Sequence, residues 1–377
     1  MGLVRYCCED RPVSWSYADP VPRGSLSRSG CAASVTTMLT RALRVALIVL
    51  LLALSGGAVA ADATSTTAAR KARFECHGID RDAVRGTDPT YTHKTLADFR
   101  NHKRLCGGLW LPTPRRYLVP QGLAVTGSTA WVSGFRYRPG YGERPCQLRR
   151  INLVTGQQLA FHAAIYGRVG QRPRTYCRHG GGILQRGGYL WIVEKNKLWQ
   201  VDPSARSSVL NARRVWRIKA PARGSAIVAT KKAIGLVPFV TTGRASIYWF
   251  RFKQLQKPGV LDLGARAKGT TQVGAVARTP VPTLVQGATL DGAGGLYLAR
   301  SSLACGELIT PGGRRLGFVP GAEGIQFGPA GKRLYVVSES GARPYVKSRK
   351  PLTAGVNRFE WPGLGHGRKA DCGFAAP

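Results

Sequence analysis

A short pattern of polar, glycine and apolar positions recurs along the sequence. Its clearest copy is residues 285–300, VQGATLDGAGGLYLAR, where Gln286-Gly287 opens one apolar segment and Leu296-Tyr297-Leu298 forms a second. Residues 291–295 between them are Asp, Ala and Gly, and Asp and Gly tolerate the reversed backbone angles of tight turns. The pattern therefore predicts a β-hairpin whose second strand has an aromatic residue at its centre.

Three further clear copies follow the same order of residue types, and a weaker one lies at residues 223–240. The clear copies are PQGLAVTGSTAWVS at 120–133, HGGGILQRGGYLWIV at 179–193 and EGIQFGPAGKRLYVVS at 323–338. In all four clear copies a glycine precedes a Trp or Tyr by nine to eleven residues. A hairpin repeated at intervals of a few tens of residues is typical of radial or linear β architectures.

The hairpins open units of about four short strands, although the third unit is irregular. The units are residues 121–165, 179–220, 225–282, 286–320 and 323–361. Because no helix separates them, they predict an all-β fold, a β-propeller of five blades, or of six if residues 259–282 hide a further blade. A β-sandwich would not repeat one glycine-to-aromatic pattern, and a β-solenoid would need shorter and more even repeats.

The fifth unit is one strand short. Residues 110–119, which precede the first unit, are expected to supply the missing outer strand and close the ring. Closure by a strand from the other end of the chain leaves no exposed sheet edge.

The first hundred residues divide differently. Residues 1–37 are an irregular polar extension, disordered or mis-annotated, because residues 38–60 have a basic start, an apolar run and an A-x-A motif. That order is typical of a secretory signal peptide, with Met38 as the true start, and it predicts a secreted, extracellular protein without a membrane span after cleavage. Residues 61–108 form an irregular N-terminal segment with one short helix over 95–103, and residues 109–377 form the propeller.

Six cysteines follow the signal peptide, and an even number in a secreted chain favours disulfides. None belongs to a C-x-x-C pair, so neither a zinc ribbon nor a redox site is indicated. Cys146 and Cys177 fall on one face of neighbouring predicted blades, which is a physical reason to pair them. The remaining predicted bridges are Cys76–Cys106, which would hold the irregular segment to the domain, and Cys305–Cys372.

The 377-residue chain is strongly basic. It has 56 Lys and Arg against 19 Asp and Glu, a net charge of +37, while hydrophobic residues make up 44% and suffice for a buried core. Such a charge attracts polyanions. A biased codon supply would explain the abundant arginines but not the scarcity of acids, so both interpretations stand.

The expected propeller geometry predicts where a functional site would lie. In each blade the linker into the innermost strand and the loop between the second and third strands lie on one face, which we call the upper face. The residues that open the innermost strands should surround a central channel: Gln121, His179, Arg223, Gln286 and Glu323. The upper loops supply candidate ligand-binding residues: Arg136, Tyr137, Arg138, Tyr141, Glu194, Glu339, Arg343, Tyr345 and Lys347.

Two of these loops, FRYRPGYGERP at 135–145 and GARPYVKSRK at 341–350, interleave basic residues with tyrosine. Arginine offers forked donors to phosphate or carboxylate, and tyrosine offers a flat face to sugars. The alternative is that both loops are merely solvated. In a secreted protein, wall polymers or anionic glycans are more natural partners than nucleic acid.

The repeats AEGIQFGPAGKRLYVVSES at 322–340 and LVQGATLDGAGGLYLAR at 284–300 resemble the blade pattern of the SMP-30/gluconolactonase and NHL-like propellers, over about residues 120–364. In lactonase-type members, an Asn or Asp at the start of the pattern and a Glu from another blade hold a divalent metal. The resemblance places those positions at Gln121, Gln286 and Glu323. Gln replaces the acid twice and Glu replaces Asn once.

A hard cation such as Ca or Mg prefers several oxygen ligands, including more than one carboxylate. Glu323 and His179 are the candidate metal ligands, and Glu194 and Glu339 could also reach inward. The alternatives are that the channel groups hydrogen-bond one another and water, or that Glu323 pairs with Arg223. The sequence contains no G-x-S-x-G, H-E-x-x-H or Walker motif.

The main functional hypothesis is a secreted, monomeric propeller that binds an anionic partner of the cell envelope on its upper face, without catalysis or a required cofactor. One alternative is a divalent-metal-dependent hydrolase, lactonase-like or phosphoesterase-like. Another is a scaffold for an envelope protein.

Overall fold

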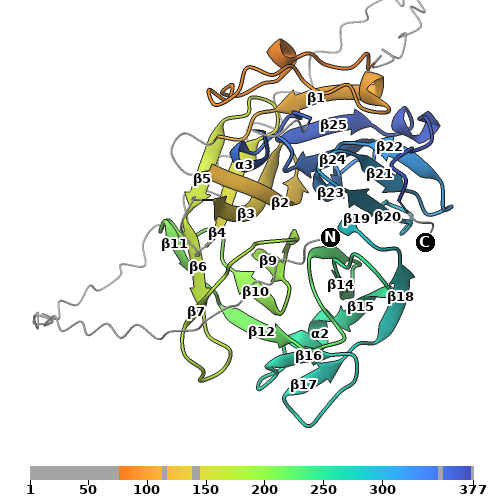
Figure 1. Cartoon of the computed structure of the whole chain (residues 1–377). Coiled ribbons are helices and arrows are strands. Elements are labelled where there is room, and N and C mark those ends of the chain that lie inside the picture. Colours follow the sequence, from red (N-terminus) through yellow and green to blue (C-terminus); the bar gives the residue numbers. More distant parts are fainter. Residues whose placement is uncertain (1–75, 113–116, 138–144, 347–350, 375–377) are drawn as a thin grey trace, which may run out of the picture. The chain divides into compact units, whose positions relative to one another are not determined.

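Five β-sheets stand around a central channel, each with one edge strand at the channel (Figure 1). The computed structural model describes residues 76–112, 117–137, 145–346 and 351–374. All of them belong to one compact unit, Lys71–Pro377. The innermost strands contact one another in chain order, and the last also contacts the first, so the protein is a five-bladed β-propeller. The predicted extension and signal peptide, residues 1–60, lie outside the described residues.

Each blade is a four-stranded antiparallel ladder numbered from the channel outward. Blade 1 contains β2 (Tyr117–Thr126), β3 (Thr129–Tyr137), β4 (Cys146–Asn152) and β5 (Gln158–His162). Blade 2 contains β8 (Ile183–Arg186), β9 (Tyr189–Glu194), β10 (Lys197–Val201) and β12 (Arg214–Ile218). Blade 3 contains β13 (Ala226–Ala229), β14 (Ala233–Val237), β15 (Ala245–Arg251) and β18 (Ala277–Val281). Blade 4 contains β19 (Val285–Leu290), β20 (Leu296–Ser301), β21 (Gly306–Ile309) and β22 (Arg315–Phe318).

Blade 5 closes the ring with a strand from the N-terminal side, as predicted, but the strand is not the predicted one. It contains β23 (Ala322–Phe327), β24 (Arg333–Ser338), β25 (Val356–Glu360) and, outermost, β1 (Leu105–Leu109). The expectation for residues 110–119 was wrong, because β2 already begins at Tyr117 and pairs with β3. The sequence of β1, LCGGL, does not look like a strand. Its glycine is a packing requirement, since a Cβ on Gly108 would lie 2.9 Å from that of Ala354.

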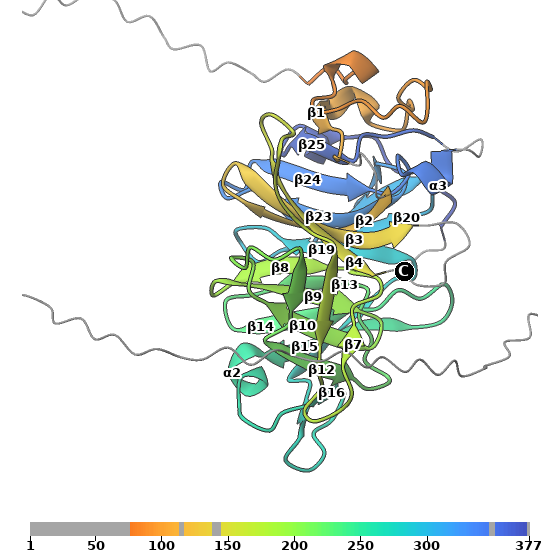
Figure 2. The same ribbon diagram turned by 90° about the vertical axis from the view of Figure 1, so that its left-hand side faces the viewer.

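The irregular stretch after β15 does not form a sixth blade. It passes through the one-turn helix α2 (Phe252–Leu255) and then adds β16 (Asp262–Gly264) and β17 (Gln272–Gly274) to blade 2 in parallel, before β18 returns to blade 3. A small sheet of β6 (Ala164–Gly167), β7 (Thr175–Tyr176) and β11 (Val209–Asn211) links blades 1 and 2. Edge-on, α2 and the other one-turn helix, α3 (Arg343–Val346), lie on opposite faces (Figure 2). No helix among the described residues is long and apolar enough to cross a membrane.

The recurring glycine is explained by the narrowness of the ring. A Cβ on Gly122 would lie 2.2 Å from the carbonyl oxygen of Gly181 in the next blade, and one on Gly287 would lie 2.1 Å from that of Glu323. A β-bulge accompanies the polar-glycine pair in three innermost strands, at Pro120/Gly122, Val285/Gly287 and Ala322/Ile325. A bulge redirects one side chain out of the ladder, which here frees the polar residue from the strand's alternation.

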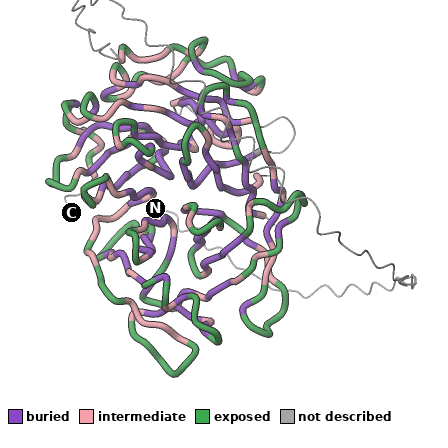
Figure 3. Tube along the Cα trace, turned by 180° about the vertical axis from the view of Figure 1, so that it is seen from behind, coloured by how far each residue is buried: buried purple, intermediate pink, exposed green. Residues whose placement is uncertain are grey.

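Buried stretches run through the blades (purple in Figure 3). The aromatic residues at the centres of the second strands are buried in clusters that combine residues of neighbouring blades. Trp131, Trp191, Tyr297 and Tyr335 are 1–7% exposed. Trp191 also stacks on Trp216 with ring centroids 5.4 Å apart. These residues therefore build the core of the propeller.

The N-terminal segment lies against the outer part of blades 4 and 5 without the predicted helix over 95–103. Asn101 takes a left-handed conformation with φ of 71°, which interrupts a helix, and only the 3₁₀ turns Arg81–Ala83 and His102–Arg104 form. A third 3₁₀ turn, Leu364–His366, follows β25. The Asn101 amide donates to the carbonyl oxygens of Gly317 and Arg368, both at 2.9 Å, and so ties both ends of the described chain to blade 4.

The three predicted disulfides are present. Cys76–Cys106 holds the N-terminal segment to β1, and Cys146–Cys177 joins β4 to the linker that enters β8. Cys305–Cys372 joins the β20–β21 loop to the C-terminal tail.

Candidate functional site

A hydrogen-bonded chain of polar side chains lies at the upper mouth of the channel. His179 donates through Nε2 to Oε1 of Gln121 at 2.7 Å, an assignment that follows because the amide oxygen can only accept. Gln121 in turn donates through Nε2 to Glu339 at 2.9 Å, and Gln286 donates to Glu323 at 2.7 Å. Glu323 and Glu339 hydrogen-bond each other, which joins both halves. We call these five residues the polar ring.

The two carboxyl groups of the polar ring are in different protonation environments. Glu323 is 2% exposed, and burial raises its pKa well above the ordinary range, with the charge of Glu339 and the shared hydrogen bond adding to the effect. Glu339 is half-buried and accepts a hydrogen bond from Gln121. The surroundings of Glu323 therefore favour its neutral form, and Glu339 is one of the groups that cause this.

Four of the five predicted channel residues come together in the polar ring. The fifth member of the ring is Glu339, which follows β24 and was predicted as an upper-loop residue. The remaining predicted channel residue, Arg223, is exposed and lies apart from Glu323 in a neighbouring cleft. The hydrogen-bond and ion-pair partners of Glu323 are Gln286 and Glu339, so the proposed Glu323–Arg223 pair is absent from the described structure. The alternative that the channel groups bond one another matches the geometry.

The arrangement of donors does not favour a divalent cation at Glu323 and His179. Nε2 of His179 is directed at Gln121, one oxygen of Glu323 accepts from Gln286, and the two carboxyl groups bond each other. Within the described residues, one set of three or more His, Cys, Asp or Glu side chains brings its ligand atoms within 4.8 Å. That set is Cys146, Cys177 and Glu194, whose sulfurs form a disulfide. The metal hypothesis stays a prediction.

A second feature lies beside the polar ring, between blades 2 and 3. It is a cleft of about 930 Å³, which we call the basic cleft. Four upper-face connections contribute to it, before β8, between β9 and β10, before β13 and after β14. Its lining includes Arg178, His179, Glu194, Lys195, Asn196, Lys197, Arg223 and Phe239.

The acid in the cleft serves the protein itself. Glu194 is 5% exposed and accepts hydrogen bonds from the backbone N–H of Arg178 at 2.9 Å and from the indole N–H of Trp199 at 3.3 Å. It also forms an ion pair with Lys197 at 3.4 Å. With both oxygens engaged, Glu194 fixes one wall of the cleft, and the Cys146–Cys177 bridge anchors the same segment. It leaves little negative charge to oppose the other basic groups.

The described ends of the two predicted tyrosine loops meet on the upper face. Tyr137 of blade 1 and Tyr345 of α3 both pack against a small cluster of Val119, Phe135 and Ala342. Arg136 and Arg343 stand next to them in the chain and are half-buried. The candidates Arg138, Tyr141 and Lys347 lie outside the described residues.

Five side chains that line the basic cleft were not among the sequence-based candidates: Arg178, Lys195, Asn196, Lys197 and Phe239. Arg178 and Lys195 adjoin His179 and Glu194, which the pattern does select, so their proximity could have been inferred from the same loops. Phe239 follows β14 in the irregular third unit, where no clear copy of the repeat fixes the boundaries. Nothing in the sequence separates it from a core aromatic.

The similarity of this chain to known proteins lies in structure and not in sequence. No protein family matches the sequence, and no curated protein is similar to it. Among solved structures, the calcium-binding protein regucalcin from Agrobacterium tumefaciens is 14% identical with a TM-score of 0.36, covering 66% of this chain and 91% of that one. A gluconolactonase from Xanthomonas campestris is 10% identical with a TM-score of 0.34, covering 65% and 86%. Likenesses of this size say nothing about the activity of this chain.

Proposed function

We propose that this protein binds an anionic polymer of the cell envelope through the upper face of its propeller. The observation that carries the proposal is the unneutralised charge of the basic cleft. Arg178, Lys195 and Arg223 are exposed, and none of them forms an ion pair with another described residue. Basic groups gathered in a concave site, with the local acid engaged elsewhere, attract and hold an anion.

A polymer suits the arrangement better than a small anion. The basic cleft and the tyrosine loops lie on one face, so a chain of repeated charges could engage both regions at once. The overall charge of +37 would accelerate the encounter. Three disulfides suit an oxidising compartment, which agrees with a site of action outside the cell.

The test is the salt dependence of binding to two probes, polygalacturonate and long-chain polyphosphate. We expect the triple variant Arg178→Ser/Lys195→Ser/Arg223→Ser to bind both more weakly. The slope of log K against log[salt] should fall by up to about three, because each lost contact releases fewer counterions.

A charge-matched control removes three exposed basic residues away from the cleft, Arg150, Lys232 and Lys253, each replaced by Ser. This control should bind almost as tightly as the parent. Binding of the parent to neither probe, or equal loss in both triple variants, would contradict a specific upper-face site.

The carboxyl pair favours a second candidate, a hydrolase acting at the channel mouth. A buried carboxyl group with a raised pKa, Glu323, next to a second carboxyl group, Glu339, is an arrangement that general acid–base chemistry uses. Under this candidate, Glu323→Gln and Glu339→Gln should each abolish turnover of lactones or phosphoesters and leave polymer binding intact. Turnover that depends on an added divalent ion would instead support the metal-dependent form.

A further inference from the structure

The basic cleft contains an exposed aromatic ring. Phe239 is 40% exposed, and among the large hydrophobic residues that the described structure leaves exposed it is the single aromatic, beside Val154, Leu159, Val209 and Val276. Phe239 lies in the cleft with the unpaired cations, whereas none of the four aliphatic residues lines it. A single exposed apolar side chain is ordinary on a protein surface, so the significance of Phe239 comes from its place in a concave site beside exposed cations.

The cleft has the size and rigidity of a ligand site. Its volume of about 930 Å³ exceeds what an inorganic anion needs and falls within the usual range for small-molecule pockets. The wall that carries Arg178 is held by Glu194 and by the Cys146–Cys177 bridge. A site fixed before binding loses less conformational entropy when the ligand arrives.

The combination of groups indicates the ligand chemistry. Arg178 and Arg223 offer forked donors for a carboxylate or phosphate, and Lys195 adds a point charge. Asn196 and His179 offer further polar groups at the same cleft, suitable for hydroxyls. The flat ring of Phe239 offers a surface on which the C–H face of a sugar can pack.

We propose that the basic cleft binds one acidic sugar residue of the polymer. This inference rests on the proposed function. The sugar ring packs on Phe239, and its carboxylate or phosphate is held by Arg178 and Arg223. The cleft thus distinguishes an acidic glycan from polyanions that contain no sugar. Of the polar ring, only His179 lines the cleft, so the subsite does not require Glu323 or a metal.

The experiment compares three polymers on the full mature chain: polygalacturonate, a phosphorylated dextran and long-chain polyphosphate. We expect Phe239→Ala to weaken binding of the two sugar polymers by roughly tenfold, the size of one good aromatic contact, and to change polyphosphate binding by less than about twofold. Phe239→Tyr retains the ring and should restore sugar binding. Leu159→Ala, an exposed apolar residue outside the cleft, is the matched control and should bind like the parent.

The outcomes separate the subsite from the proposed function. Equal weakening of all three polymers by Phe239→Ala, or no weakening of any, would overturn the sugar subsite. A parent protein that binds polyphosphate alone would also overturn the sugar subsite, although the proposed binding of a polyanion would still hold. A parent that binds none of the three refutes the proposed function itself. Loss for only one of the two sugar polymers supports the subsite and identifies its anionic group as carboxylate or phosphate.

Discussion

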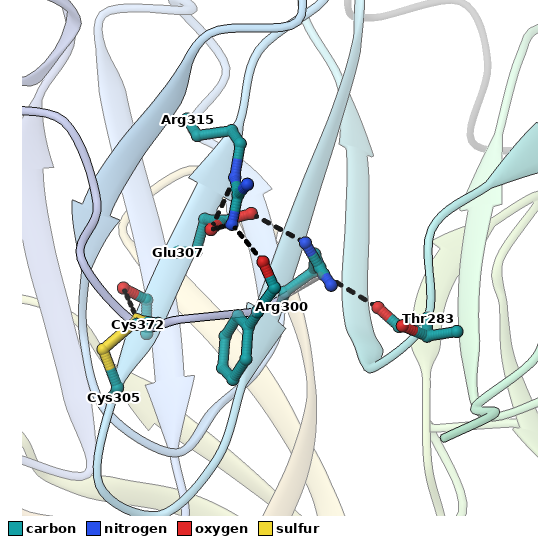
Figure 4. A network of polar contacts seen from close by, with 8 residues as sticks. Thr283, Arg300, Cys305, Glu307, Arg315 and Cys372 are labelled. Atoms are coloured by element: carbon teal, nitrogen blue, oxygen red, sulfur yellow. Dashed lines mark hydrogen bonds and ion pairs between the residues drawn. A yellow bond between two sulfur atoms is a disulfide. The ribbon is translucent and has the colours of Figure 1, made fainter. Parts of the chain in front are cut away.

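Arginine has opposite surroundings in blade 4 and in the basic cleft. In blade 4, the Arg300 side chain is 1% exposed and bonds Glu307 at 3.1 Å and the Thr283 carbonyl oxygen at 2.8 Å (Figure 4). Arg315 bonds the same carboxylate at 2.6 Å. We call Arg300, Glu307 and Arg315 the blade 4 triad. The C-terminal tail covers it, and the centroid of the Phe374 ring lies 5.0 Å from Cζ of Arg300. In the cleft, Arg178 and Arg223 are exposed and form no such bonds with described residues.

The difference shows how one residue type serves two purposes in a very basic chain. In blade 4 each buried charge has a hydrogen-bonded partner, so the arginines hold strands and tail together. In the cleft, Glu194 is the acid that would neutralise the arginines. Its carboxylate instead accepts hydrogen bonds from the backbone N–H of Arg178 and the indole N–H of Trp199. Charge that the fold leaves unsatisfied is available to a ligand.

The largest expected effect comes from breaking the blade 4 triad. Glu307→Gln keeps the shape of the side chain but leaves two arginines without a counter-charge, one of them fully buried. We expect the free energy of unfolding to fall by about 3–5 kcal/mol in chemical denaturation. Glu360→Gln, which breaks the more exposed pair with Arg333, is the control and should cost less than about 1 kcal/mol. Similar losses in both variants would refute a special role for the buried triad.

The next effect tests the tail that covers the triad. Replacing both Cys305 and Cys372 with Ser opens a loop that spans 67 residues and releases the tail from the β20–β21 loop. We expect a loss of about 2–4 kcal/mol, and limited proteolysis should cut the tail faster than in the parent. A variant with unchanged proteolysis would show that Phe374 and Arg315 hold the tail without the bridge.

Much of this fold follows from the repeat. The glycine-to-aromatic pattern predicted five blades, or six if the irregular third unit held another, because the spacing of the inner strands around a narrow ring produces it. The closing strand was misplaced, since Gly107 and Gly108 hide a strand whose packing is set by tertiary contacts. The parallel strands β16 and β17 were not predicted. Each is three residues long, and the two strands follow β15 of blade 3 in the chain but extend the sheet of blade 2.

The candidate site was predictable in part for a different reason. Gln121, Gln286 and Glu323 each occupy a bulge in the repeat, so topology alone brings them to one mouth. Whether they bind a metal or one another depends on side-chain directions that spacing does not determine. Arg300 and Arg178 look alike in the sequence, because burial and pairing are properties of the folded chain.

A smaller effect is expected from the polar ring, and it depends on pH. The pKa of Glu323 is raised in the folded protein, so folding retains a proton that the unfolded chain releases above its ordinary value of 4.5. Stability from this group is complete below that pH and is lost as the pH rises toward the folded pKa, by at most about 1.4 kcal/mol per pH unit. Glu323→Gln carries no such proton and can still bond Gln286 and Glu339. Its stability relative to the parent should therefore rise with pH between 4 and 8 in urea unfolding. A constant difference across that range would show that Glu323 is ionised in the native state.

The smallest effect should come from the cleft itself. Arg178→Ser/Lys195→Ser/Arg223→Ser removes three exposed charges that have no described ion-pair partners, so the free energy of unfolding should change by less than about 0.5 kcal/mol per site. At low salt the variant should have the slightly higher free energy of unfolding, because the chain carries a net charge of +37 and each removed charge relieves repulsion. Added salt should reduce this gain by screening. Urea unfolding at 20 and 300 mM salt, with the Arg150/Lys232/Lys253 control alongside, measures both quantities. If the cleft variant instead loses stability on the scale expected for Glu307→Gln, its arginines serve the fold as those of blade 4 do, and the case for a ligand in the cleft falls with the comparison.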